Sequence, residues 1–357
     1  MKVVLCWAGI AGYLAACWRA LERRPEIDLS IIALGPAAAS PFADALVRDL
    51  PCRLLDDAQR RDAAQVAALV IEQRPDIVHV PGWFVPAFRR LPRHPALAGV
   101  KFILGMDTPR LHTLAQSANR LRLGRFVRGM DLVVVPGERA WQYARFLGAP
   151  ESRIRRGLYG VDFDAIAPAY ERRLEAPGGW PRRFLSVGRY ADEKGIDVLV
   201  EGYRRYREAV SDPWPLDCCG AGPLATLLRG CPGVTDLGFV QPDRQGAVWA
   251  EHGGFVLASR FDPWPLVIVE ASAAGLPVVC TEACGSAVEV VRGLHSGVTV
   301  ATGDPRALAD GLRWVHDNHA LCPRLGRAAQ QLAAAYSADR WADRWVRLCA
   351  ELAASAG

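Results

Sequence analysis

The chain has 357 residues, of which 51% are hydrophobic and 23% charged, and its formal net charge is +5. These fractions are typical of globular proteins and exclude a disordered or fibrous chain, and the length suggests two domains of about 150 residues each. Only three lysines, Lys2, Lys101 and Lys194, occur among the 43 basic residues. Because arginine is the usual cation in this chain, a position that has lysine instead calls for an explanation.

The N-terminal half begins with a predicted strand, Val3–Cys6, a glycine-containing turn and a helix. Leu14-Ala15-Ala16-Cys17 is similar to a lipoprotein cleavage site, but the helical spacing of apolar residues continues past Cys17 and favours the strand–turn–helix. No other apolar run reaches the roughly 20 residues that span a membrane. Further strands are predicted at Leu29–Leu34, Ile77–Val80, Lys101–Leu104 and Leu132–Val135.

The strand pattern restarts after Pro181. The predicted strands are Arg183–Val187, Pro215–Cys218, Val234–Leu237, Gly254–Leu257 and Pro277–Cys280, and helical patterns include Val198–Val210 and Val267–Ala274. Strands that alternate with helices predict parallel sheets covered on both faces. We therefore expect an α/β protein with two doubly wound, Rossmann-like domains that face a central cleft. Their expected ranges are 1–165 and 181–335, with a Pro- and Gly-rich linker at 166–180 and a C-terminal helix at 336–357 that packs back on the first domain.

The first candidate site lies where a predicted strand ends at Gly188 and a loop leads to the next helix. It contains Arg189 and Lys194. A planar guanidinium and a compact ammonium suit two neighbouring phosphates. The alternative is a solvated Glu193–Lys194 pair at the start of a helix.

The second candidate site, residues 259–271, follows an apolar strand and opens a helix. Backbone N–H groups near Trp264–Val267 can bind an anion there. Asp262 and Glu270 place carboxylates at the two ends of the element, where they can accept hydrogen bonds from hydroxyls of separate sugars. The alternative is a capping aspartate and a surface glutamate, although the apolar neighbours of Glu270 make an idle carboxylate costly.

Together these segments resemble the retaining family 4 glycosyltransferases of the GT-B fold. The resemblance is strongest over residues 181–310, where Gly220-Ala221-Gly222-Pro223, Leu237-Gly238-Phe239-Val240 and Gly285-Ser286 also match. Looser matches in the N-terminal half are Asp76–His79, Asp131–Val135 and Gly160–Asp162. The resemblance implies retaining, metal-independent transfer from a nucleotide diphosphate sugar, the co-substrate, to an acceptor hydroxyl in glycan or glycolipid biosynthesis, with no cofactor.

The resemblance also implies roles for particular residues. Arg189 and Lys194 would neutralise the diphosphate, Asp262 would hold the donor sugar and Glu270 the ribose. Asp107 would contact donor or acceptor. The remaining donor-binding residues implied are Gly9, Gly12, Gly188, Phe239, Val240, Trp264, Pro265, Leu266 and Val267, with Phe239 and Val240 near the base.

Three positions depart from the family pattern. Asp262 is one methylene shorter than the usual glutamate, Pro265 replaces a glycine and removes an N–H, and Met106 stands where a histidine is common. Asp162-Phe163-Asp164 has the form of a D-x-D metal motif, but its place in the interdomain turn favours a capping role, so no metal is expected.

The segment 86–128 contains nine basic residues and one acid, Asp107, for a net charge of +8. It suits an anionic membrane surface or an acidic acceptor, and the alternative is a solvated arginine-rich face. Nucleic acid is not expected, because no binding module accompanies the charge. The scattered cysteines indicate reduced thiols and a cytoplasmic protein, with a peripheral position at the inner membrane face if the contact forms.

Two rival functions remain open at this point. A sugar-nucleotide epimerase or hydrolase of similar fold would consume the nucleotide sugar without an acceptor. A non-catalytic sugar-nucleotide-binding subunit would bind the nucleotide without turnover, and the departures at Met106 and Asp262 favour it.

Overall fold

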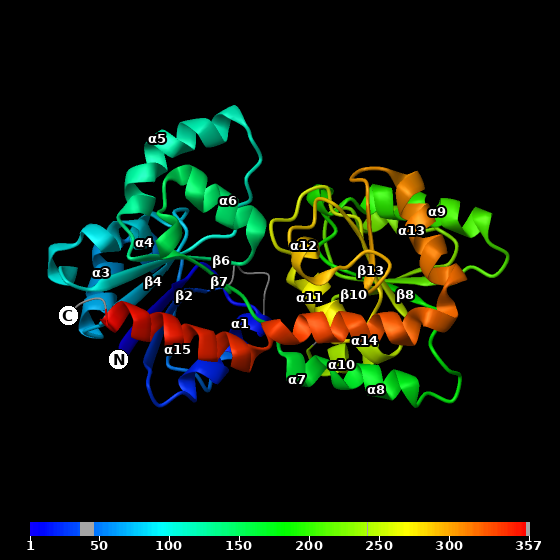
Figure 1. The fold of residues 1–357 in the computed structure, drawn as a ribbon, viewed down its shortest axis with the longest axis horizontal. Helices are drawn as coiled ribbons and strands as arrows, with labels where there is room; N and C mark the ends of the chain where they lie inside the picture. The colour runs from blue at the N-terminus through cyan, green and yellow to red at the C-terminus, as the bar shows by residue number, and fades with distance from the viewer. Residues whose placement is uncertain (36–45, 241, 355–357) are drawn as a thin grey trace. The chain divides into compact units, whose positions relative to one another are not determined.

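The computed structural model describes residues 1–35, 46–240 and 242–354. It divides into two compact units, Met1–Asp162 with Ala338–Gly357, and Phe163–Ser337. Each unit is built on its own parallel sheet (Figure 1). No helix in the described part of the chain combines the length and the apolar character needed to cross a membrane.

The first unit contains a parallel sheet of order β3-β2-β1-β4-β5-β6-β7. Its inner strands are mostly apolar because helices cover both faces of the sheet, whereas the edge strands β3 and β7 are short and include arginines. The strands are β1 Lys2–Trp7, β2 Asp28–Leu34, β3 Cys52–Leu55, β4 Ile77–Pro81, β5 Lys101–Gly105, β6 Leu132–Val135 and β7 Ile154–Arg156. The α-helices are α1 Gly12–Glu22, α3 Ala63–Glu72, α4 Pro86–Arg90, α5 Leu114–Arg128, α6 Glu138–Leu147 and α15 Ala338–Ala354.

The C-terminal helix α15 belongs to this first unit and packs against α1 (Figure 1). Trp341 and Trp345 are buried at helical spacing. Their indole N–H groups donate to the carbonyls of Leu158 (3.0 Å) and Gly157 (3.3 Å), so the helix is fixed by polar contacts as well as by apolar burial.

The second unit contains a parallel sheet of order β10-β9-β8-β11-β12-β13. Helices α9 and α13 pack side by side on it (Figure 1). The strands are β8 Phe184–Val187, β9 Leu216–Cys219, β10 Val234–Gly238, β11 Gly254–Leu257, β12 Val278–Thr281 and β13 Gly297–Val300. The α-helices are α7 Phe163–Ile166, α8 Pro168–Leu174, α9 Ile196–Ala209, α10 Pro242–Ala250, α11 Leu266–Ala273, α12 Ala287–Val290, α13 Pro305–Asp317 and α14 Cys322–Ala333.

The segment 166–180, predicted as a linker, lies within the second unit. Pro168 occupies the first turn of α8, a position where proline is well tolerated. The Arg173 guanidinium is buried and donates to the carbonyls of Trp249 (2.8 Å), Ala274 (2.9 Å) and Gly275 (3.1 Å). These contacts tie the segment to α10 and to the end of α11, and the division between the units falls after Asp162.

Both sheets have a switch point, where the strand order reverses. In the first sheet it lies between β1 and β4, and in the second between β8 and β11. Ligands of doubly wound sheets bind at the carboxyl ends of the strands near such points. The loops that follow these four strands therefore position the candidate sites.

Candidate functional sites

Lys194 and Asp262 form an ion pair at the switch point of the second sheet. Lys194 ends a 3-10 turn, Asp192–Lys194, in the loop after β8, and Asp262 lies in the loop after β11. Their side chains are 17% and 9% exposed. Burial raises the pKa of the Asp262 carboxyl above its ordinary value, and the nearby Lys194 ammonium opposes that rise.

Backbone contacts hold the two loops against each other. Gly195 has a φ of +63°, and a Cβ at this position would lie 2.2 Å from the Ala258 carbonyl oxygen, so a glycine is required. The Glu193 carbonyl accepts a hydrogen bond from the Arg260 amide (2.8 Å). On the other side, the Gly285 amide donates to the Asp262 carbonyl (2.9 Å). The ammonium and the carboxylate are thus pre-positioned by main-chain geometry.

Arg189 lies in the same loop but remains open to solvent, with 73% of its side chain exposed, and it pairs with Glu193 at 2.5 Å. In the part of the chain that the structure describes, no atom lies within 4 Å of where a Cβ would stand on Gly188. By contrast, a Cβ on Gly220 would lie 1.9 Å from the Gly188 carbonyl oxygen. The loop after β9 therefore passes close to Gly188 on one side, while the other side is open to a ligand.

The N-terminus of α11 lies beside this loop pair. Pro265 is its capping residue, and Leu266 and Val267 form its half-buried first turn. Trp264 is buried, and its indole N–H has no hydrogen-bond partner among the described residues. Glu270 is half-buried one turn further along α11. The first-turn amides and the macrodipole of the helix favour an anion at this end.

Phe239 and Val240 follow β10, two strands away from β8 in the sheet order. The Phe239 side chain is 57% exposed and Val240 is half-buried. Tyr190 links the loop after β8 to β10, since its hydroxyl donates a hydrogen bond to Asp236 of β10 at 2.8 Å. The donor residues predicted in the second unit thus occupy the carboxyl-end loops of β8, β10 and β11 and the start of α11, and Lys194 and Asp262 are in direct side-chain contact.

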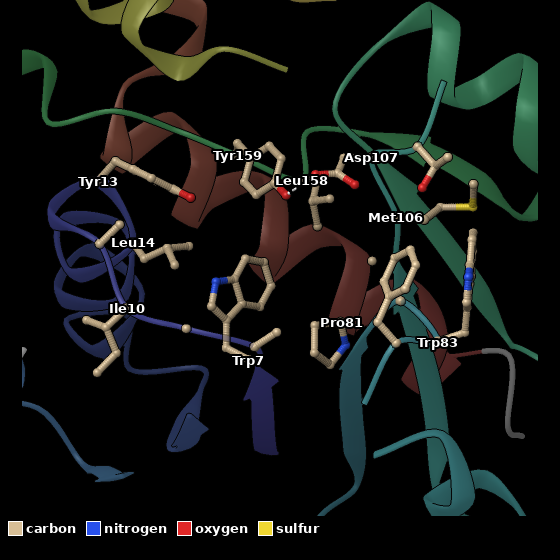
Figure 2. Close-up of a pocket in the computed structure, with 17 residues that line it drawn as sticks. Trp7, Ile10, Tyr13, Leu14, Pro81, Trp83, Met106, Asp107, Leu158 and Tyr159 are labelled. Atoms are coloured by element: carbon tan, nitrogen blue, oxygen red, sulfur yellow. Dashed lines mark hydrogen bonds between the residues drawn. The ribbon is translucent and has the colours of Figure 1, made fainter. Parts of the chain in front are cut away.

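The first unit has a pocket of about 410 Å³ at its own switch point (Figure 2). It is lined from the ends of β1, β4 and β5 and from the turn after β7. The predicted residues Gly9 and Asp107 line it, whereas Gly12, the first residue of α1, does not. A Cβ on either glycine would meet no atom of the described residues within 4 Å.

Asp107 and Tyr159 form a pair in this pocket that the sequence did not indicate. The Tyr159 hydroxyl donates to Oδ2 of Asp107 at 2.9 Å, as Figure 2 shows. Trp7 and Tyr13 pack edge-on against the Tyr159 ring, with centroids 6.2 and 6.0 Å away. Burial and the neighbouring carboxylate raise the pKa of Tyr159 well above its ordinary value, so it stays a hydrogen-bond donor.

His79 is buried and packs against Trp7, one of the residues that line this pocket. Its Nδ1 lies 3.0 Å from the Cys6 carbonyl oxygen, and its ring lies 4.7 Å from that of Trp7. Burial lowers the pKa of His79 to about 3, so the ring is neutral at ordinary pH. The side chain is a packed core histidine, in keeping with the structural role that its apolar strand suggests.

No group of three or more His, Cys, Asp and Glu residues that could hold a metal occurs in the parts of the chain that the structure describes. The independence from metal stays a prediction from the family resemblance.

Two family models together match most of the chain. Residues 8–160 match the model described as a glycosyl transferase 4-like domain, and residues 181–318 match glycosyl transferases group 1. The chain is a family 4 glycosyltransferase. The resemblance seen in its motifs is thereby confirmed, and the two matches fall on the two structural units.

Related proteins agree with this assignment. The glycosyltransferase is 28% identical to the glycogen synthase of Mycobacterium tuberculosis over 72% of this chain and 64% of that protein. It is 24% identical to the D-rhamnosyltransferase WbpZ of Pseudomonas aeruginosa over 65% of this chain and 64% of that protein. It is 28% identical to a D-inositol 3-phosphate glycosyltransferase of a Nocardioides species over 84% of this chain and 72% of that protein. The chain thus spans 64% of the length of the first two relatives.

Solved structures show the same fold. The glycosyltransferase superposes on sucrose-phosphate synthase from Thermosynechococcus elongatus with a TM-score of 0.78, at 16% identity, over 99% of this chain and 100% of that one. It superposes on HepE of Anabaena, solved with UDP and glucose, with a TM-score of 0.74, at 15% identity, over 98% of this chain and 100% of that one. The predicted GT-B class of two Rossmann-like domains is confirmed.

Proposed function

We propose that this glycosyltransferase moves a sugar from a nucleotide diphosphate sugar to an acceptor hydroxyl in glycan biosynthesis, with retention of configuration and without a metal. The observation that carries the proposal is the Lys194–Asp262 pair, which places a fixed ammonium and a carboxylate acceptor side by side at a switch point. The solved complexes of HepE with UDP and with UDP-glucose support a donor of this class.

In this proposal, Lys194 and Arg189 bind the donor diphosphate. Asp262 holds Lys194 in place. Arg189 is solvent-exposed and pairs with Glu193, and it leaves this pair to contact the bound diphosphate. Asp262 accepts hydrogen bonds from donor-sugar hydroxyls with the oxygen that does not face Lys194. The amides of Leu266 and Val267 at the start of α11 add partial positive charge toward the phosphates.

Glu270 then accepts the ribose hydroxyls, and the base packs against Phe239 and Val240. In the transfer step the bond from the anomeric carbon to the diphosphate oxygen breaks, and the acceptor oxygen bonds to that carbon on the same face. The acceptor proton passes to the departing diphosphate, whose charge Lys194 and Arg189 neutralise. This step requires no separate histidine base, which fits Met106 at the position where the family often has one.

We further propose that residues 86–128 contact an anionic membrane surface. Leu114 and Leu121, two turns apart on α5, are 90% and 87% exposed. Arg125 and Arg128 share that outward face at helical spacing. Beside it, arginines that make no ion pair among the described residues line a hollow of about 450 Å³; they are Arg89, Arg90, Arg93 and Arg122. Exposed leucines flanked by unneutralised arginines are the pattern of an interfacial helix.

The predicted cytoplasmic location fits this proposal, and the ten free cysteines support a reducing compartment. The inner face of the membrane would then supply the surface.

The proposal is tested by a thermal-shift screen of UDP-, GDP- and ADP-sugars, followed by measurement of sugar-nucleotide consumption with and without saccharide acceptors. We expect one nucleotide class to stabilise the protein and an acceptor to be required for rapid consumption. Rapid consumption without acceptor would favour the epimerase or hydrolase. Tight nucleotide binding with no turnover across a broad acceptor panel would favour a non-catalytic subunit.

A further inference from the structure

The pocket of the first unit differs from the rest of the chain in its charge. The chain has 43 basic residues, yet among the residues that the structure describes no lysine, arginine or histidine lines this pocket. Asp107 is the one charged residue among the described residues that line it. No cation pairs with Asp107 in the described part of the chain, and its partner there is the Tyr159 hydroxyl.

This charge pattern disfavours an anionic ligand. A phosphate or carboxylate in the pocket would be repelled by Asp107 and would lose its hydration without a cation to compensate. The hollow lined by Arg89, Arg90, Arg93 and Arg122 on the same unit shows the opposite arrangement. The first unit therefore separates a cation-rich surface from a cation-free pocket.

The pocket walls present aromatic rings. Trp83 and Phe84 lie side by side after β4, with ring centroids 5.3 Å apart, and Phe84 is largely exposed. Trp7 and Tyr13 line the region around Tyr159. Aromatic faces pack well against the C–H face of a sugar ring. The volume of about 410 Å³ lies in the usual range for small-ligand pockets.

The Asp107–Tyr159 pair supplies the polar group that such a ring needs. Tyr159 occupies Oδ2, and Oδ1 accepts no hydrogen bond among the described residues. Because Tyr159 is held between Trp7 and Tyr13, it fixes the orientation of the carboxylate. Oδ1 is therefore placed to accept a hydrogen bond from a hydroxyl of a ring in the pocket.

We propose that this pocket binds the acceptor as a neutral, unphosphorylated sugar ring, with an aromatic wall against its apolar face and a hydroxyl donating to Asp107. Tyr159 is a positioning residue: it orients the Asp107 carboxylate, and that carboxylate selects for a neutral ring. The inference rests on the proposed transferase function, since it names the substrate class of that reaction. It excludes acceptors whose reacting ring carries a phosphate or a carboxylate.

The test compares acceptors that share one ring and differ in charge: methyl glucoside, glucose 6-phosphate and glucuronic acid, and the equivalent galactose and mannose sets. Two measurements are made on the full chain. Quenching of tryptophan fluorescence reports binding without donor, and nucleoside diphosphate release reports transfer. We expect the neutral member of at least one set to bind about tenfold more tightly than its anionic partners.

Three variants sharpen the test. Tyr159→Phe keeps the aromatic ring of this residue and should lower the affinity for neutral sugars. Asp107→Asn should reduce the difference in affinity between the neutral and the anionic sugars of a set. Tyr170→Phe, which removes a hydroxyl bonded to the Pro323 carbonyl in the second unit, is the matched control and should leave selectivity unchanged.

Preference for an anionic member, or absence of binding by every neutral ring, would overturn the inference. Nucleotide binding is measured separately by thermal shift. If nucleotide binding is also absent, the proposed function fails together with the inference. If nucleotide binding and transfer persist with an anionic acceptor, only the inference is wrong.

Discussion

The ammonium of Lys194 contacts the carboxylate of Asp262 although 68 residues separate them in the chain. Their contact joins the loops that follow β8 and β11, the two strands at the switch point of the second sheet. The cation proposed to bind phosphate and the carboxylate proposed to bind sugar therefore belong to one ion pair. A change at either residue alters the charge that the other one experiences.

The first prediction concerns Lys194. Lys194→Met should lower the rate of sugar transfer by about 100-fold or more, because a positioned charge that stabilises a departing anion contributes on this scale. The variant also leaves a buried carboxylate without its cation, so we expect lower thermal stability in Lys194→Met than in Lys194→Met combined with Asp262→Asn. Steady-state kinetics and thermal unfolding separate the two effects.

The control is the other lysine that pairs with an aspartate, Lys101, whose Nζ lies 3.4 Å from Asp131 in the first unit. Lys101→Met should retain near wild-type turnover. Equal turnover in Lys194→Met and the wild-type protein would remove Lys194 from the donor site.

The second prediction concerns Glu270. Glu270→Gln should weaken nucleoside diphosphate binding by about 10- to 100-fold, since a hydrogen bond to a charged group contributes about 1.5–3 kcal/mol. Isothermal titration calorimetry measures the effect directly. The exposed Glu251, just after α10, provides a matched control, and Glu251→Gln should bind as the wild type does. Unchanged affinity in Glu270→Gln would assign this carboxylate a structural role.

Most of the fold could be predicted because parallel strands buried on both faces are nearly uniform apolar runs. Three strands escaped prediction. Cys52–Leu55, Ile154–Arg156 and Gly297–Val300 are short, and each includes a polar or glycine residue, so they lack that signal. The segment 166–180 was wrongly predicted as a linker, because its prolines and glycines are equally consistent with a helix start and a turn.

The candidate sites were predicted only in part. Lys194 and Asp262 each stood out in a local motif, but their contact depends on the order of strands in the sheet. Tyr159 had no local signal, since a tyrosine in a turn is unremarkable until Asp107 is brought to it by the end of β5. The charge of the pocket likewise depends on which loops meet there.

The third prediction concerns the outward face of α5. Replacing both Leu114 and Leu121 by serine should reduce binding to vesicles that contain phosphatidylglycerol, because each leucine loses apolar burial in the interface. Vesicle sedimentation at two salt concentrations measures this, and binding should also fall at higher salt. Leu294→Ser, at an exposed leucine of the second unit, is the control. Vesicle binding that is unaffected by the leucine changes would identify the arginine-rich face as simply solvated.

The last prediction concerns pH and His79. Burial lowers the pKa of His79 to about 3 in the folded chain, whereas an unfolded histidine titrates near its ordinary value of 6.5. Between these values the unfolded chain binds a proton that the folded chain does not. The stability associated with the neutral ring is therefore fully present above about pH 6.5 and falls as the pH drops toward 3, with a limiting slope of about 1.4 kcal/mol per pH unit. Urea unfolding at pH 7, 6 and 5 should show a smaller loss of stability in His79→Gln than in the wild type, while His112→Gln, at an exposed loop histidine, should follow the wild type. If His79→Gln loses as much stability as the wild type over this range, the acid sensitivity arises from other groups.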